Sequence, residues 1–340
     1  MTASFSKRLL DWYDQNHRLL PWRSNPTPYH VWLSEIMLQQ TRVEAVKGYY
    51  ARFLAALPSI ESLASASEDT CLKLWEGLGY YSRVRNLRKA AMEVVDKYQG
   101  KLPEDEALLG KLPGIGKYTA AAIASIAFQK KAVAVDGNLL RVFSRLTCST
   151  LDIREEKAKE TCHQFLFERL EERPGDFNQA LMDLGEIICL PHGAPKCDLC
   201  PFRDCCLAHL AKKELDYPIL SKSKEKKTEN LTVLLFSAGE KIAIRKRPEK
   251  GLLAALYEFP NLEGTYSQKE VEAYLKKNGF SFTKVISLGN ATHIFTHRIW
   301  KMKGYRVVLE KKIDDPSLLF VSKEELNHHY SLPSAFQYFL

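Results

Sequence analysis

Cysteines are concentrated in one short stretch of this chain, which indicates a metal centre. Five of the eight cysteines lie within the eighteen residues from Cys189 to Cys206. Thiolates at this density can hold either a structural zinc ion with four sulfur ligands or a [4Fe–4S] cluster, and the spacing alone leaves both open. The other three, Cys71, Cys148 and Cys162, are scattered through sequence that we expect to be helical, so a disulfide framework is not expected.

A glycine-containing run upstream of these cysteines indicates contact with a DNA backbone. Gly114 and Gly116 flank one apolar residue, and an alanine-rich segment follows. Glycine permits the tight, left-handed backbone of a hairpin between helices, and its missing side chain lets backbone N–H groups approach a phosphate. The helix after the hairpin points its positive N-terminal end at the same phosphate, a contact that binds DNA of any sequence. Taken alone, the run would suit a plain helix–turn–helix corner equally well.

The elements that must position these motifs differ between the two parts of the chain. Residues 1–215 are expected to be helical almost throughout, because apolar residues recur at three- and four-residue spacing. The polar, charged segment 216–230 is expected to be a linker, and residues 231–340 to form an α+β domain of short β-rich runs and helices. We expect strands at 231–236, 241–246 and 305–310, and helices at 268–277 and 323–329.

Length and charge restrict the class of protein. A chain of 340 residues is expected to form two domains, and its net charge of +8 favours a polyanionic partner. The N-terminus has no signal-peptide pattern, and no apolar run approaches the length of a membrane span. We therefore expect a cytoplasmic protein that does not enter a membrane.

With these motifs in view, the chain resembles the helix–hairpin–helix DNA glycosylase superfamily. Its domain carries such a hairpin, an aspartate further on and often a [4Fe–4S] loop, and Asp136 lies twenty residues after Gly116. The resemblance implies a mainly helical N-terminal glycosylase domain with a [4Fe–4S] loop at 189–206, followed by a C-terminal α+β domain. The first cysteine gap holds seven residues where the family usually has six, and Cys205 is a rival for the fourth position. The implied cluster ligands are Cys189, Cys197, Cys200 and Cys206.

Tyr118 separates two branches of this superfamily. In the endonuclease III branch, the second position after the last hairpin glycine is a lysine that attacks the sugar and goes on to cut the strand. A tyrosine cannot form the imine that this reaction needs. Lys117 lies about 100° away around the helix and is interpreted as a phosphate contact. We expect a single-function glycosylase that uses water; a bifunctional glycosylase/lyase of the endonuclease III type is the alternative.

The N-terminal segments 18–23 and 32–42 resemble the adenine DNA glycosylase branch. Glu35 lies in an apolar stretch of an expected helix, where burial would raise the pKa of its carboxyl group as a proton donor requires. The resemblance implies that Glu35 protonates N7 of a flipped adenine, that Asp136 stabilises the oxocarbenium-like sugar, and that Tyr118 lines the sugar or positions water. Asp136 could instead cap the following helix, but Asn138 can serve as that cap or as an orienting group and leave Asp136 free.

The resemblance also assigns residues that contact DNA. Arg18, Leu20, Trp22 and Arg23 form the adenine pocket. The residues that wedge into the stack or contact the backbone are Gln40, Tyr80, Gly114, Gly116, Lys117 and Asn138.

The C-terminal domain resembles a Nudix-type fold that lacks the glutamate-rich helix of an active pyrophosphatase. Its loop Phe295, Thr296 and His297 resembles one that recognises 8-oxoguanine, with threonine where relatives usually have serine. The expected partner is double-stranded DNA with adenine opposite 8-oxoguanine or guanine, bound by a monomer. A non-enzymatic iron–sulfur DNA-binding module is a further alternative, opposed by the presence of both Glu35 and Asp136.

Overall fold

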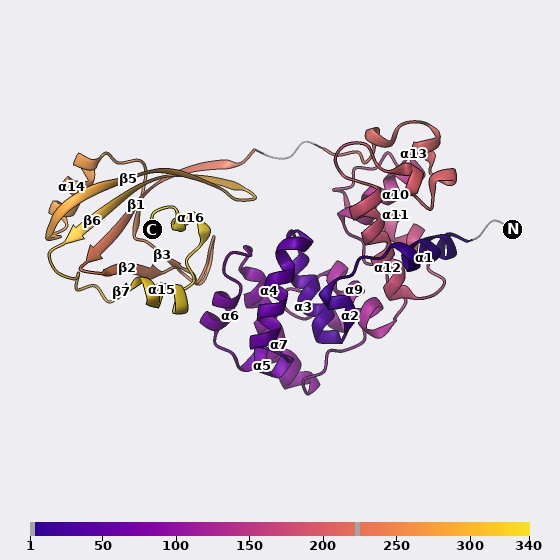
Figure 1. Ribbon diagram of the computed structural model, residues 1–340, viewed down its shortest axis with the longest axis horizontal. Helices are drawn as coiled ribbons and strands as arrows, with labels where there is room; N and C mark the ends of the chain where they lie inside the picture. The colour runs from indigo at the N-terminus through magenta and orange to yellow at the C-terminus, as the bar shows by residue number, and fades with distance from the viewer. Residues whose placement is uncertain (1–3, 222–224) are drawn as a thin grey trace. The chain divides into compact units, whose positions relative to one another are not determined.

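A computed structural model describes residues 4–221 and 225–340 (Figure 1). Its contacts divide the chain into two compact units, of which unit 1 comprises Met1–Ser65 and Asn86–Lys222. Unit 2 comprises Ala66–Arg85 and Ser223–Leu340. The segment Ala66–Arg85, which we expected within the first domain, therefore groups with the C-terminal part of the chain. No helix among the described residues is both long enough and apolar enough to cross a membrane.

Unit 1 is built from helices, as the apolar spacing predicted. The alanine-rich helix α9 packs against α3 and α12, because the small, buried side chains of Ala120, Ala121, Ala122 and Ala124 allow close approach. The helices are α1 (Phe5–Asn16), α2 (Pro21–Ser24), α3 (Pro28–Leu38), α4 (Val43–Ala56), α5 (Ile60–Ser65), α7 (Ser82–Tyr98, whose first turn belongs to unit 2), α8 (Glu106–Leu109), α9 (Lys117–Phe128), α10 (Gly137–Thr147), α11 (Glu156–Phe167), α12 (Pro174–Asp183) and α13 (Leu207–Leu210).

The cysteine-rich loop is attached to the helical core of unit 1. A π-helical turn, Leu184–Ile188, continues α12 directly into Cys189, and short 3₁₀ turns occupy Cys197–Leu199 and Arg203–Cys205. Between the last cysteines, Phe202 is 1% exposed and stacks on Phe5 of α1 with 4.3 Å between ring centroids. This aromatic anchor fixes the loop against the core without involving any sulfur atom.

Unit 2 contains a mixed sheet in the order β3-β2-β1-β6-β5, with β4 pairing with β1 and β7 with β2. The long central strands β1 and β6 run parallel, and the other pairs are antiparallel. Apolar clusters cover both faces, as expected for a sheet packed on two sides. The strands are β1 (Lys227–Ala238), β2 (Lys241–Lys246), β3 (Tyr257–Glu258), β4 (Asn261–Glu263), β5 (Phe282–Ile294), β6 (Arg298–Leu309) and β7 (Leu318–Val321).

Two helices of unit 2 begin and end where the sequence predicted, but the linker ends earlier than expected. Helices α14 (Gln268–Lys277) and α15 (Lys323–His329) have the expected bounds, and a short α16 (Ser334–Gln337) follows. β1 already begins at Lys227, so the last residues of the expected linker 216–230 are strand paired with β6. These polar residues lack an apolar alternation because neither face of this end of β1 is buried. Residues 222–224 of the expected linker lie outside the described residues.

The segment Ala66–Arg85 is held in unit 2 by polar contacts. It carries α6 (Glu68–Leu74), which packs against α15. Lys73 Nζ donates to the carbonyl oxygen of Tyr330 at 3.2 Å, and Glu76 Oε1 accepts from the backbone N–H of Leu332 at 2.8 Å. Lys73 and Glu76 also pair with each other at 2.6 Å. The two half-buried charges therefore neutralise one another at the backbone groups that they bind.

Candidate active site and cysteine cluster

A cavity of about 420 Å³ in unit 1 brings together the predicted catalytic and adenine-pocket residues and two of the residues predicted to contact DNA. Its walls come from α2, α3 and the turn after it, α9, α10 and α12. A hollow of this size is large enough for a nucleobase with its sugar. The predicted residues that line it are Arg18, Leu20, Trp22, Arg23, Glu35, Gln40, Tyr118, Asp136 and Asn138.

Glu35 is a buried carboxyl group on α3. The helix starts at the Thr27 cap with Pro28 in its first turn, and its middle is buried on nearly every side, so Glu35 is only 5% exposed. Tyr118 Oη donates a hydrogen bond of 2.8 Å to Glu35 Oε2. Burial raises the pKa of Glu35 to about 7, although the hydrogen bond from Tyr118 opposes the rise. The carboxyl group can therefore hold or release a proton near neutral pH.

Asp136 caps α10, so its carboxylate is not left free of a capping role as we expected. Its Oδ1 accepts from the backbone N–H of Leu139 at 2.7 Å, and its Oδ2 accepts from Asn138 Nδ2 at 3.1 Å. Burial raises the pKa of Asp136, while the bond from Leu139 and the charge of Arg141 oppose that rise. Asn138 is thus the orienting group, and Asp136 both caps the helix and lines the cavity.

A path of hydrogen bonds, absent from our sequence predictions, leads from Asp136 to the cysteine loop. Asn138, which bonds to Asp136, accepts from Arg141 Nη2 at 2.8 Å. Arg141 Nε in turn donates to the backbone carbonyl of Cys189 at 2.8 Å, and Nη2 also donates to that of Gly185 at 2.7 Å. The position of the Asp136 carboxylate is therefore tied to the course of the loop. Asn138 and Arg141 are three residues apart and so lie on one face of α10, and this spacing was the available sequence signal for their contact.

Asp183 holds two residues of the predicted adenine pocket, Arg18 and Arg23, and was also missed. Its buried carboxylate accepts two bonds from the Arg23 guanidinium, at 2.7 and 3.0 Å, and a third from the backbone N–H of Arg18 at 3.1 Å. Gln179 lies one turn earlier on α12 and lines the same cavity. The four-residue spacing of Gln179 and Asp183 puts them on one helix face, but nothing in the sequence indicates which loop they contact.

The hairpin residues lie outside this cavity. Gly114 has φ +79°, and a Cβ there would stand 2.7 Å from Cβ of Asn86, so a side chain would be strained and crowded. Gly116 is the N-cap of α9, and a Cβ there would meet nothing within 4 Å. The exposed Lys117 pairs with Glu156 at 3.1 Å. This open, cationic helix start is the geometry that a phosphate contact requires.

The residues expected to hold the opposite base are placed as follows. α3 ends at Leu38, so Gln40 lies in the turn beyond the helix, with φ +57°. Tyr80 belongs to unit 2, where its hydroxyl lies 2.9 Å from Thr296 Oγ1. Phe295, Thr296 and His297 form the turn between β5 and β6, with Phe295 packed edge-on against Trp300.

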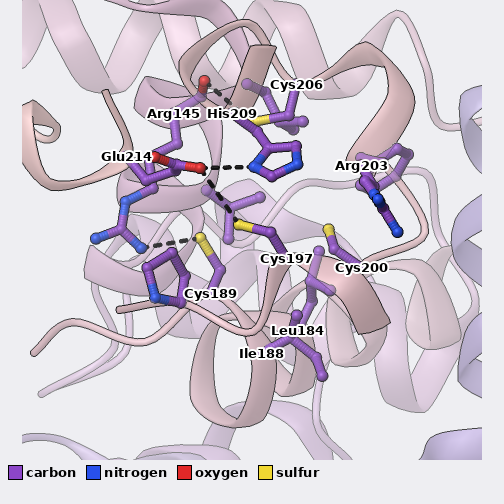
Figure 2. Close-up of a pocket in the computed structure, with 14 residues that line it drawn as sticks. Arg145, Leu184, Ile188, Cys189, Cys197, Cys200, Arg203, Cys206, His209 and Glu214 are labelled. Carbon is purple, nitrogen blue, oxygen red and sulfur yellow. Dashed lines mark hydrogen bonds and ion pairs between the residues drawn. The ribbon is translucent and has the colours of Figure 1, made fainter. Parts of the chain in front are cut away.

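Four of the five clustered cysteines face one small cavity of about 30 Å³ (Figure 2). These are Cys189, Cys197, Cys200 and Cys206, whereas Cys205 is exposed and its sulfur accepts from Arg8 Nη1 at 3.4 Å.

Charged groups surround the four thiols. The buried Arg145 places Nη1 3.2 Å from Cys189 Sγ, and His209, which lines the same cavity, bonds to Glu214 at 2.6 Å. Cys197, His209 and Glu214 have ligand atoms within 4.8 Å of one another, so a zinc ion is chemically possible as well. Four sulfur donors beside a buried guanidinium suit an anionic iron–sulfur centre.

Comparison with known proteins places this geometry in a family. A family model described as HhH-GPD superfamily base excision DNA repair protein matches residues 33–167, and a NUDIX domain model matches residues 231–340. The adenine DNA glycosylase of Schizosaccharomyces pombe is 32% identical, over 95% of this chain and 86% of the relative. This chain belongs to the adenine DNA glycosylase family. The adenine DNA glycosylase of Rattus norvegicus is 33% identical, over 91% of this chain and 71% of the relative. That of Buchnera aphidicola subsp. Schizaphis graminum is 36% identical, over 82% of this chain and 80% of the relative.

Solved structures support the fold of the glycosylase. A thermostable thymine-DNA glycosylase is 29% identical with a TM-score of 0.56, over 61% of this chain and 95% of its own. An endonuclease III–DNA complex has a TM-score of 0.52, over 61% of this chain and 94% of its own. At 22% identity this likeness shows the fold alone. The predicted pairing of a helical glycosylase domain with a C-terminal Nudix-like domain is confirmed, as is the base excision repair glycosylase class.

Proposed function

We propose that this glycosylase removes adenine mispaired with 8-oxoguanine or guanine in double-stranded DNA, as a monomer and without cutting the strand. The observation that carries the proposal is the meeting of Glu35, Tyr118 and Asp136 in one cavity, which Arg18, Leu20, Trp22 and Arg23 also line. A proton donor with a raised pKa and a second carboxylate in a different environment are the two groups that glycoside hydrolysis needs.

The two carboxyl groups divide the work. Glu35 donates its proton to N7 of the flipped adenine, so that the base leaves as a neutral group when the C1′–N9 bond breaks. Tyr118 holds Oε2 of Glu35, which keeps the other carboxyl oxygen available for this transfer. Asp136, oriented by Asn138 and Leu139, stabilises the positive charge that develops on the sugar. Water then adds to C1′, and its proton leaves the site.

The absence of a lysine at position 118 supports single-function chemistry. Lys117 is exposed and lies outside the lining of the cavity, where it pairs with Glu156. A lyase would need an amine at the sugar carbon, so the expected product is an intact strand with an abasic site.

A [4Fe–4S] cluster held by Cys189, Cys197, Cys200 and Cys206 is the proposed cofactor. Bound there, it would supply cross-linking of the loop rather than a step of the hydrolysis. Arg145 would offset the negative charge of the sulfur ligands, and Arg141 would transmit the position of the loop to Asn138 and Asp136.

Recognition of the opposite base is assigned to unit 2 and Gln40. The loop Phe295–His297 joins the two long strands β5 and β6, and Thr296 is exposed; its hydroxyl meets that of Tyr80 at 2.9 Å and would exchange this partner for an 8-oxoguanine edge. Tyr80 and Gln40 would enter the base stack at the site that the flipped adenine leaves.

The test uses the purified full chain and a duplex with one adenine opposite 8-oxoguanine. Strand products are compared with and without hot alkali, alongside a guanine-opposite duplex and a thymine-opposite control. Cleavage that requires alkali, is preferred at the mispairs and is lost in Glu35→Gln supports the proposal. Cleavage without alkali would place the chain with the bifunctional enzymes. Binding with no cleavage under either condition would favour the non-enzymatic module.

A further inference from the structure

The turn that carries Tyr80 has an unusual backbone. Gly77, Gly79 and Tyr80 have φ values of +90°, +77° and +49°, so three of four consecutive residues are in the left-handed region. Glycine adopts this region freely, but a tyrosine is strained there and stays only where its surroundings hold it. Tyr80 nevertheless keeps 44% of its surface exposed, so its own ring is not the anchor of the turn.

Arg83 supplies much of what holds the turn. Its guanidinium is 5.3 Å from the ring centroid of Trp75 and 5.4 Å from that of Tyr80, so the cation lies against both aromatic faces. Nη2 donates to the carbonyl oxygen of Gly79 at 3.1 Å. Trp75 Nε1 donates to that same oxygen at 3.0 Å. The peptide directly before Tyr80 is therefore fixed from two sides.

The placement of Arg83 excludes the usual surface role of an arginine in a DNA-binding protein. The residue is only 8% exposed, beneath the Tyr80 ring, so it is not available to a phosphate. Burial lowers the pKa of Arg83 to about 10, which still leaves the guanidinium charged at neutral pH. A charge retained in such a place needs strong local compensation, here two aromatic rings and the carbonyl oxygens of the turn.

We propose that Arg83 is the positioning residue that holds Tyr80 in its left-handed conformation and so presents the ring for insertion into the DNA base stack. The inference rests on the proposed function, because it takes from it the insertion of Tyr80. Arg83 touches neither substrate nor the reacting atoms; it acts through Tyr80. The planar guanidinium suits this role, because its face contacts the rings of Trp75 and Tyr80 while one of its N–H groups donates to the carbonyl oxygen of Gly79.

The experiment is a double-mutant cycle between Arg83→Met and Tyr80→Leu in the full chain. Lys89→Met, an exposed change on the same helix, is the matched control. Each variant is titrated into a duplex with 2-aminopurine beside 8-oxoguanine, whose fluorescence reports unstacking, and Kd is measured with the same duplex. Thermal unfolding is followed to confirm that each variant is folded.

We expect Arg83→Met and Tyr80→Leu each to weaken binding about tenfold, the fold-change that corresponds to the loss of one base–aromatic stacking contact, and to reduce the fluorescence change. The double variant should be no worse than Tyr80→Leu, and Arg83→Lys should restore part of the signal. Independent, multiplying effects, or an Arg83→Met protein that behaves like Lys89→Met, would overturn the proposal.

Two further arms keep the outcome clear. If Arg83→Met does not fold, Trp75→Phe removes one donor to Gly79 and keeps an aromatic ring at this position. A fluorescence loss in the same direction is expected, and an unchanged signal would count against the proposal. If the wild type fails to remove adenine, the proposed function fails, while the fluorescence of the bound lesion duplex still decides the role of Arg83.

Discussion

Replacing Tyr118 with phenylalanine should extend adenine removal to higher pH. The change removes the hydroxyl that donates at 2.8 Å to Glu35 Oε2 and leaves the ring. That hydrogen bond opposes the burial that raises the pKa of Glu35 to about 7, so its loss lets the pKa rise further. A hydrogen bond to a charged group contributes about 1.5–3 kcal/mol, and one pKa unit corresponds to about 1.4 kcal/mol. Since the neutral carboxyl keeps part of the bond, we expect a rise of about one unit.

The assay is the single-turnover rate of adenine removal between about pH 5.5 and 9.5. A general acid acts only when protonated, so the wild-type rate should fall as pH rises through about 7, and the falling limb should move up by about one pH unit in Tyr118→Phe. The substitution can also change the maximal rate, but this does not affect the test, because the pH at which the rate falls is determined separately from the height of the pH profile. Met182→Leu, which changes the sulfur 3.8 Å from the same hydroxyl, is the control and should leave the limb in place. An unmoved or lowered limb in Tyr118→Phe would refute the assignment of Glu35 as the acid.

Three further predictions concern the groups around the cavity. Glu35→Gln should abolish adenine removal yet stabilise the fold at pH 8 by up to about 3 kcal/mol in urea unfolding: the folded-state pKa exceeds the ordinary 4.5, so the wild type loses stability as pH rises from 4.5 to 7. Asp183→Asn should lower the urea midpoint, since breaking a buried pair costs about 3–5 kcal/mol, and should weaken adenine removal; an unchanged midpoint would count against its role beside Arg23. Arg141→Gln should reduce adenine removal and accelerate iron loss to a chelator, whereas unchanged activity and iron retention would show that the path to Asp136 carries no coupling.

Local signals account for what the sequence predicted best. The bounds of α14 and α15 were predictable because each starts with a capping box, Ser267 with Glu270 and Ser322 with Glu325. The hairpin glycines and the cysteine spacing are local as well. The convergence of the predicted pocket residues on one cavity followed from the resemblance, since residues far apart in sequence have no local signal for their meeting.

The failures involve contacts between distant segments. The early start of β1 depends on pairing with β6, about seventy residues later, as in Lys227 with Arg298. The grouping of Ala66–Arg85 with unit 2 depends on contacts such as Glu76 with Leu332. Asp136 was expected to be free because two candidate caps, Asp136 and Asn138, adjoin the start of α10, and the folded backbone determines which of them bonds. Tertiary context overrides local preference at each of these positions.

Arg141 bonds to a backbone atom of the cysteine loop, and the choice of this atom determines which property of the loop affects the active site. Arg141 donates to the backbone carbonyl of Cys189 and not to its sulfur, so Asp136 responds to the path of the chain. Any occupant that folds the loop along this path, iron–sulfur or zinc, would set the carboxylate equally well. The enzyme would then be active once the loop has folded around its metal centre. Its activity would not depend on the oxidation state of that metal.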